Sequence, residues 1–142
     1  MIKPSQSQIW AVLRKDYHIH RVNYSLTAGF LGRLCLSGEI FDIPDKNWQI
    51  TLEAIKFYGE IAPIIKDGYT KIIECTAEDY SDPAGYQIVL RELGDEALMI
   101  VHTFKDGANP PVEKYLENWQ ITKTFGSDLD GDFRGKAYLI ER

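Results

Sequence analysis

The three histidines of the chain are the residues with the most specific potential chemistry. His18 and His20 are two positions apart, so on a β-strand both imidazoles would lie on one face. Such pairs can hold a metal ion, and His102 could supply a third ligand. Residues 21–24 add no glutamate to complete the set. The hypothesis is a metal-dependent enzyme or small-ligand binder, and the alternative is three hydrogen-bonded histidines at the edge of the core.

A second candidate for metal chemistry is the acidic loop at residues 128–135. Counted from Asp130, an EF-hand loop would place ligands or turns at Asp132, Gly135 and Glu141. Arg134 occupies another ligand position, where its cation would oppose a bound divalent ion. The segment that ends at Glu141 also has the pattern of a strand and not of a helix. A solvated Asp/Gly turn is therefore the alternative interpretation.

Motifs of nucleophilic catalysis do not occur in the sequence. It contains no GxSxG elbow, no cysteine beside a histidine, and no glycine loop followed by Lys-Ser or Lys-Thr. The paired carboxylates Glu78 and Asp79 lie in a polar segment that offers no desolvation to raise a pKa. The sequence therefore gives no argument for hydrolysis and none for a cofactor, and it leans against an enzyme.

The segment at residues 74–86 has the composition of a recognition element. Its carboxylates would steer a basic partner, and its tyrosines would bury a large area at low entropic cost. An ordinary polar hairpin loop is the alternative. The predicted partner-binding residues are Glu74, Glu78, Asp79, Tyr80, Asp82 and Tyr86.

Charge is distributed unevenly around a net value of −5. Residues 1–33 hold Lys3, Arg14, Lys15, Arg21 and Arg33 against one aspartate, whereas residues 72–96 hold seven carboxylates against Arg91. An acidic surface repels phosphate backbones, so nucleic acid is a disfavoured partner. A solvated face that keeps the protein soluble is the other interpretation.

The elements that must position these residues can be read from hydrophobic periodicity. A capping residue at Ser5 before the apolar grouping at 9–13 predicts a short helix, and alternation over residues 17–26 predicts a strand that carries His18 and His20. Strands are predicted at residues 30–36 and 39–43 around a Ser37-Gly38 turn. The longest predicted helix covers residues 45–66, with Pro63 bending or breaking its last turn. Its predicted buried stripe is Trp48, Leu52, Ile55, Ala62 and Ile65.

The second half of the chain is predicted to be richer in strands. They are expected at residues 69–76, 86–93, 97–105 and 136–140, with a hairpin at residues 94–96 and a helix from Val112 to Trp119 after Pro110-Pro111. The run at 98–101 should be central in the sheet because it is apolar on both faces. The expected fold is α+β, a mainly antiparallel sheet of six to seven strands with two to three helices packed on it.

Length and composition favour a single domain over residues 1–142. The first residues lack a secretory signal and no apolar run is long enough to cross a bilayer, so a cytoplasmic protein is expected. Cys35 and Cys75 lie in apolar runs and are expected to be free, buried thiols. The segment Asn-Trp-Gln-Ile-Thr occurs at residues 47–51 and 118–122, but its flanks differ, which disfavours an internal duplication.

A small acidic α+β domain without a catalytic signature, with the segment from Glu74 to Tyr86, resembles the immunity proteins of bacterial polymorphic-toxin and contact-dependent growth inhibition systems. The resemblance implies a protein that binds a cognate toxin, often a basic nuclease, and neutralises it without doing chemistry itself. Such a protein would bind neither membrane nor nucleic acid. A further possibility is a subunit or scaffold that forms homo-oligomers through an exposed apolar edge strand.

Overall fold

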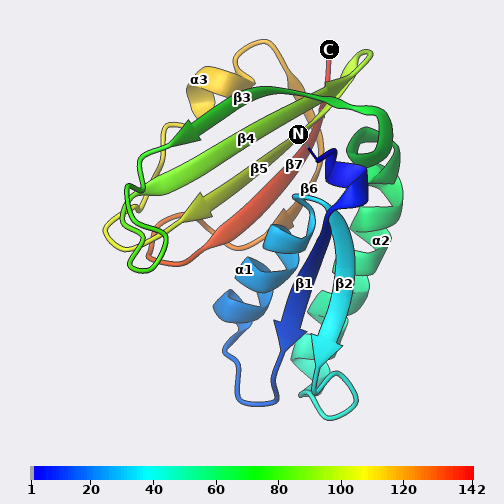
Figure 1. Ribbon diagram of the computed structural model, residues 1–142, viewed down its shortest axis with the longest axis vertical. Helices are drawn as coiled ribbons and strands as arrows, with labels where there is room; N and C mark the ends of the chain where they lie inside the picture. Colours follow the sequence, from blue (N-terminus) through cyan, green and yellow to red (C-terminus); the bar gives the residue numbers. More distant parts are fainter. Residues whose placement is uncertain (1) are drawn as a thin grey trace.

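The computed structural model describes residues 2–142. Two parallel strands and two helices come first, and an antiparallel sheet follows (Figure 1). After a 3₁₀ turn at Pro4–Gln6, the first half comprises β1 (Gln8–Leu13), α1 (Ile19–Gly29), β2 (Arg33–Gly38) and α2 (Asp45–Asp67). The second half comprises β3 (Tyr69–Cys75), β4 (Tyr86–Leu93), β5 (Glu96–Thr103), α3 (Glu113–Leu116), β6 (Gln120–Gly126) and β7 (Gly135–Glu141). Among the described residues, three α-helices and seven strands confirm the predicted α+β class.

The short helix predicted over the apolar residues 9–13 is wrong, because that segment forms the strand β1. This strand pairs in parallel with β2, and α1 is the crossover that parallel pairing requires. Ala11 and Leu13 are buried, whereas Trp10, the residue before Ala11, is 65% exposed. This alternation of buried and exposed side chains is typical of a strand. Over so few residues the apolar positions fit both the repeat of a helix and the alternation of a strand.

The predicted strand at residues 17–26 is also wrong, because it forms α1. The buried residues Val22, Leu26 and Gly29 follow helical spacing. His18 is the N-cap, and its Nδ1 accepts a hydrogen bond from the backbone N–H of His20 at 3.4 Å. The two histidines therefore start a helix and do not share one face of a strand.

The predicted strand at residues 39–43, with its Ser37-Gly38 hairpin, does not form. Gly38 ends β2 with φ +91°, and a Cβ there would lie 2.2 Å from the carbonyl oxygen of Leu13. The chain then runs through a loop in which Phe41 is 88% exposed before α2 begins. β2 pairs only with β1 among the described residues, so the segment contributes a parallel ribbon and not a hairpin.

The long helix is confirmed as α2, but its predicted buried stripe is largely on the wrong face. Trp48, Leu52 and Ile55 are partly exposed to solvent, whereas the core residues on α2 are Thr51, Ala54, Phe57, Ile61, Ile64 and Ile65. Two apolar stripes run along this helix, and the sequence pattern does not distinguish between them. Pro63 is accommodated inside the helix, which continues to Asp67.

The five-stranded sheet has the order β3-β4-β5-β7-β6, and all its neighbours are antiparallel. The four strands predicted in this half are confirmed as β3, β4, β5 and β7, with β5 in the centre. β6 was missed, and the predicted helix at residues 112–119 shortens to the four residues of α3. The Asn-Trp-Gln-Ile-Thr copies differ in structure, since the first lies in α2 and the second leads into β6.

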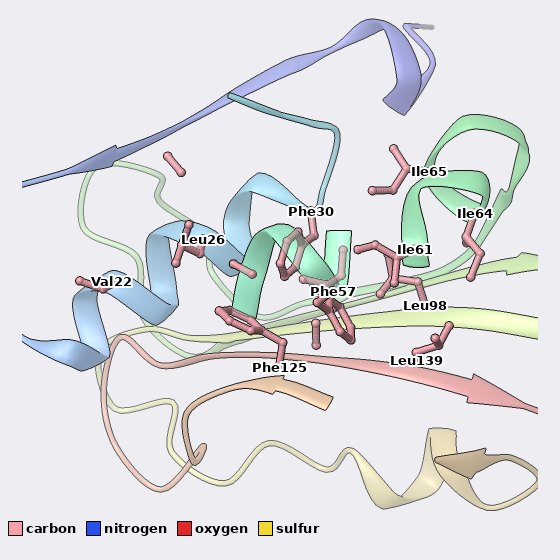
Figure 2. Close-up of a cluster of buried hydrophobic side chains, with 14 of the residues drawn as sticks. Val22, Leu26, Phe30, Phe57, Ile61, Ile64, Ile65, Leu98, Phe125 and Leu139 are labelled. Atoms are coloured by element: carbon pink, nitrogen blue, oxygen red, sulfur yellow. The ribbon is translucent and has the colours of Figure 1, made fainter. Parts of the chain in front are cut away.

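The central strands β4, β5 and β7 are largely buried on both faces of the sheet, whereas the edge strands β3 and β6 are largely exposed. On one face α1 and α2 lie between the sheet and the β1–β2 ribbon, and Phe30, Phe57 and Phe125 meet at ring-centroid distances of 5.3 to 6.0 Å (Figure 2). On the other face, Val112 and the partly buried residues of the α3 segment cover Met99 and Tyr138. No helix among residues 2–142 is both long and apolar enough to cross a bilayer. The strand β3 remains at the edge, next to the predicted recognition segment.

Candidate functional site

The predicted recognition segment forms the loop at residues 76–85, between β3 and β4. Its base is closed by Thr76, whose backbone N–H donates to the carbonyl oxygen of Tyr86 at 3.0 Å and whose Oγ1 accepts from the N–H of Tyr86 at 2.9 Å. Asp79 forms a second turn, because its Oδ1 accepts from the N–H and the hydroxyl of Ser81 at 2.8 and 2.7 Å. The loop is thus held at its base and at its tip.

Four of the six predicted binding residues project from this loop. Glu78, Asp79 and Asp82 are exposed, and Tyr80 is 98% exposed. The hydrogen bonds from Ser81 lower the pKa of Asp79, so this carboxylate stays ionised at neutral pH. The loop therefore presents an uncovered aromatic ring among three negative charges, with no Lys or Arg within residues 76–85.

The other two predicted residues, Glu74 and Tyr86, are engaged within the chain. Glu74 accepts hydrogen bonds from the hydroxyls of Tyr86 and Tyr115, and its Oε2 lies 2.8 Å from Nζ of Lys114. The hydrogen bond with Lys114, followed by that with Tyr86, lowers the pKa of Glu74, and the same bond to Glu74 raises the pKa of Tyr86. These contacts join β3 and β4 to α3, so we assign both residues to bracing the base of the site.

The histidine pair lies at the start of α1, beside the loop that precedes β7. The rings of His18 and His20 have centroids 4.9 Å apart, and Nη1 of Arg134 lies 2.6 and 2.8 Å from the two ring nitrogens of His20. Burial, followed by the nearby charge of Arg134, lowers the pKa of His20. A guanidinium in contact with the ring is an unfavourable neighbour for a divalent ion.

His102 does not join this pair. It is buried on β5, where its ring meets Tyr24 edge-on at a centroid distance of 4.9 Å. Burial lowers its pKa to about 4, opposed by a hydrogen bond with the backbone of Tyr24. Within residues 2–142, no three side chains of His, Cys, Asp or Glu are grouped so that they could hold a metal ion. The structure does not assemble the predicted three-histidine site.

A cleft of about 730 Å³ opens beside the histidine pair, between α1, β1 and the loop before β7. Its walls carry His18 and His20 and a set of aromatic side chains. These aromatic residues are Trp10, Tyr17, Tyr24 and Phe133. Such walls suit a planar apolar surface, either of a small molecule or of another polypeptide. Sequence reasoning missed Trp10 and Phe133 because they come from segments more than one hundred residues apart.

The acidic loop before β7 does not have the form of an EF-hand. Gly135 and Glu141 are the two ends of β7, so an extended strand separates them by about 20 Å. Asp132 accepts a hydrogen bond from the backbone N–H of Asp106 at 3.0 Å. The predicted calcium ligands therefore serve a turn and a strand, and the calcium interpretation is wrong.

The cysteines differ from expectation in their exposure. Both thiols are free, but Cys35 is only partly buried and Cys75 is exposed at the end of β3. Compared with family models, curated proteins and solved structures, the chain shows no match. The best-supported candidate site is consequently the one with the clearest geometry, the loop at residues 76–85.

Proposed function

We propose that this chain is a non-enzymatic protein-binding domain that recognises a basic partner through the loop at residues 76–85. The observation that carries the proposal is the state of Tyr80, which is 98% exposed in a loop closed by internal hydrogen bonds. Exposing a large aromatic ring has no benefit for folding. Burial of that ring against a partner would recover the hydrophobic free energy.

The charge of the loop supports a basic partner. Glu78, Asp79 and Asp82 surround Tyr80, and the loop itself contains no compensating cation. Three carboxylates of one sign speed the encounter with a positively charged surface, and the effect weakens as salt is added. Tyr80 would slow dissociation, because a buried aromatic anchor acts mainly on the off-rate.

The finer form of the proposal is that the partner is a toxin and that the chain is its immunity protein. A nuclease toxin carries a basic surface that binds phosphate, and an acidic loop could occupy that surface in place of nucleic acid. The inhibitor would need no catalytic residues. This form predicts that the toxin has no nuclease activity while it is bound to the chain. It also predicts that the Tyr80→Ala variant inhibits the toxin less, so that part of the nuclease activity returns.

Site-specific cross-linking tests the proposal. A photoreactive phenylalanine analogue replaces Tyr80 in one sample and Gln49, an exposed residue of α2, in a control sample. The proposal predicts a discrete cross-linked protein from position 80 alone, lost when Glu78 and Asp79 are both replaced by lysine. The control is Glu53→Lys, a charge reversal on α2, which should leave the cross-link at position 80 in place. Equal yields from positions 80 and 49 would count against the loop as the binding site.

A second candidate function is assembly through the β1–β2 ribbon. Parallel strands are normally part of larger sheets that are covered on both faces, yet in the part of the chain that the structure describes this sheet has two strands. Trp10, which also lines the cleft beside the histidine pair, is 65% exposed on β1, and Phe41 is 88% exposed after β2. Light scattering of the wild type and of Trp10→Ser distinguishes this candidate. A dimer or larger assembly that Trp10→Ser reduces to a monomer would favour it.

A further inference from the structure

The edge strand β3 has a row of backbone groups directed away from the sheet. Within residues 2–142, its only neighbour in the sheet order is β4. Thr76 donates its N–H to Tyr86, which fixes the alternation of the ladder. In an antiparallel pair, residues that exchange hydrogen bonds alternate with residues whose N–H and C=O point outward. Ile73 and Cys75, the odd-numbered residues after the bulge, therefore direct these groups to the free edge.

The side chains of this edge are also uncovered. Ile73 is 66% exposed and Cys75 is exposed, and both lie on the face that also carries Val89 and Gln87 of β4. A strand laid along the edge would place alternate side chains on this same face. The irregularity between Thr70 and Ile72 interrupts the ladder, so the regular edge begins at Ile72.

The opposite edge of the sheet is protected in a way that β3 is not. On β6, Nζ of Lys123 forms an ion pair with Glu60 of α2. A lysine on an edge strand opposes pairing with another chain, because its charge would have to be moved or desolvated. β3 carries Lys71 only at its irregularity, and the stretch from Ile72 to Cys75 contains no cation. By this criterion, the stretch from Ile72 to Cys75 is the less protected part of the two edges.

We propose that β3 accepts an extended segment of the partner as a sixth strand, while the loop at residues 76–85 holds the basic end of that segment. This inference rests on the proposed function and names the form of the partner. The partner segment has apolar residues at alternate positions, which cover Ile73, and Lys or Arg at the end that meets Glu78 and Asp79. The loop follows β3 directly, so both parts of the segment are reached by one continuous chain.

The recognition has two separable components. Backbone hydrogen bonds to Ile73 and Cys75 give affinity for any extended chain, and the carboxylates of the loop select a basic one. Replacing Cys75 by proline removes one outward N–H without touching the ladder to β4, and a strand conformation at Glu74 is compatible with a following proline. Replacing Cys75 by serine keeps that N–H and serves as the matched control.

The test uses four synthetic peptides of eight residues. Two alternate valine and threonine and carry two lysines at the amino or the carboxyl end, because the direction of the added strand is open. The other two have glutamates in place of the lysines. We expect saturable binding of one lysine peptide, at least tenfold tighter than its glutamate counterpart, with slowed amide exchange at Ile73 and Cys75. We expect Cys75→Pro to weaken it about tenfold, and Cys75→Ser to leave it unchanged.

Several results would overturn the inference. These are no binding of either lysine peptide, equal binding of the glutamate peptides, or binding that leaves both amides unprotected. Amide protection that rises with protein concentration in the absence of peptide would show that β3 pairs with a second copy instead. Exchange is measured on the wild-type chain, so the test stands even if Cys75→Pro fails to fold. Failure here, with position-specific cross-linking at Tyr80 intact, would remove strand addition and leave the proposed function standing.

Discussion

The hydroxyl of Tyr86 donates a hydrogen bond to the carboxylate of Glu74 across the β3–β4 pair, and Tyr115 from α3 donates to the same carboxylate. Glu74 also pairs with Lys114. The carboxylate of Glu74 thus joins β3, β4 and α3 at the base of the loop that carries Tyr80. Of the residues predicted together as a binding surface, Glu74 and Tyr86 are engaged within the chain, whereas Tyr80 is 98% exposed.

Tyr86→Phe tests this division of roles. The substitution removes the hydroxyl but keeps the ring, so we expect a lower midpoint of thermal unfolding with little change in affinity for a partner. Tyr80→Ala should do the reverse, because its side chain is almost fully exposed. Thermal unfolding and binding isotherms of both variants provide the measurement. A loss of affinity on Tyr86→Phe as large as that on Tyr80→Ala would contradict the division.

The two stripes of α2 predict a clear contrast in stability. Ile61 is fully buried between α2 and the sheet, so Ile61→Ala should lower the free energy of unfolding by about 2–5 kcal/mol. Leu52 lies on the outer stripe, and Leu52→Ala should have an effect within about 1 kcal/mol. Urea denaturation of the two variants measures both values. If both variants lost the same free energy of unfolding, the outer stripe of α2 would have to be covered in solution.

His102 should make stability depend on pH. Burial lowers its pKa to about 4 in the folded chain, against 6.5 for an ordinary histidine. Between these values the unfolded chain binds more protons, so stability rises with pH from about 4 to 6.5 and is then constant for this group. The contribution amounts to about 3 kcal/mol.

His102→Gln removes this titration and is therefore expected to flatten the profile. Urea denaturation at pH 4.5 and pH 7.5 compares the wild type with His102→Gln. The wild type should lose stability at the lower pH, and His102→Gln should lose less. If His102→Gln shows the same loss as the wild type, the buried histidine is not its source.

The sequence was most informative where one periodicity was unambiguous. The strands of the second half follow from runs such as Leu98 to Val101, which are apolar on both faces, and α2 follows from its length. The first half failed because the apolar positions around Trp10 and Val22 fit both periods. Strand pairing decided β1, since its hydrogen bonds go to β2 about 25 residues later, and a local pattern carries no information on such a partner.

The candidate site was predictable in composition but not in its connections. The mixture of carboxylates and tyrosines in the sequence pointed to the loop around Tyr80. The tie between Glu74 and Lys114 could not be foreseen, because it depends on how α3 lies across the sheet. For the same reason His102 could not be separated from His18 and His20 before the fold was known, since all three follow apolar alternation in the sequence.

The most direct test of the central claim is the affinity of the partner that cross-links at position 80. It is measured for the wild type and for the chain in which Glu78 and Asp79 are both lysine, at about 50 and 300 mM salt. If the loop recognises a basic partner, the double variant binds at least tenfold more weakly at low salt, and the difference shrinks at high salt. Equal affinities of the two chains at both salt concentrations would contradict the account.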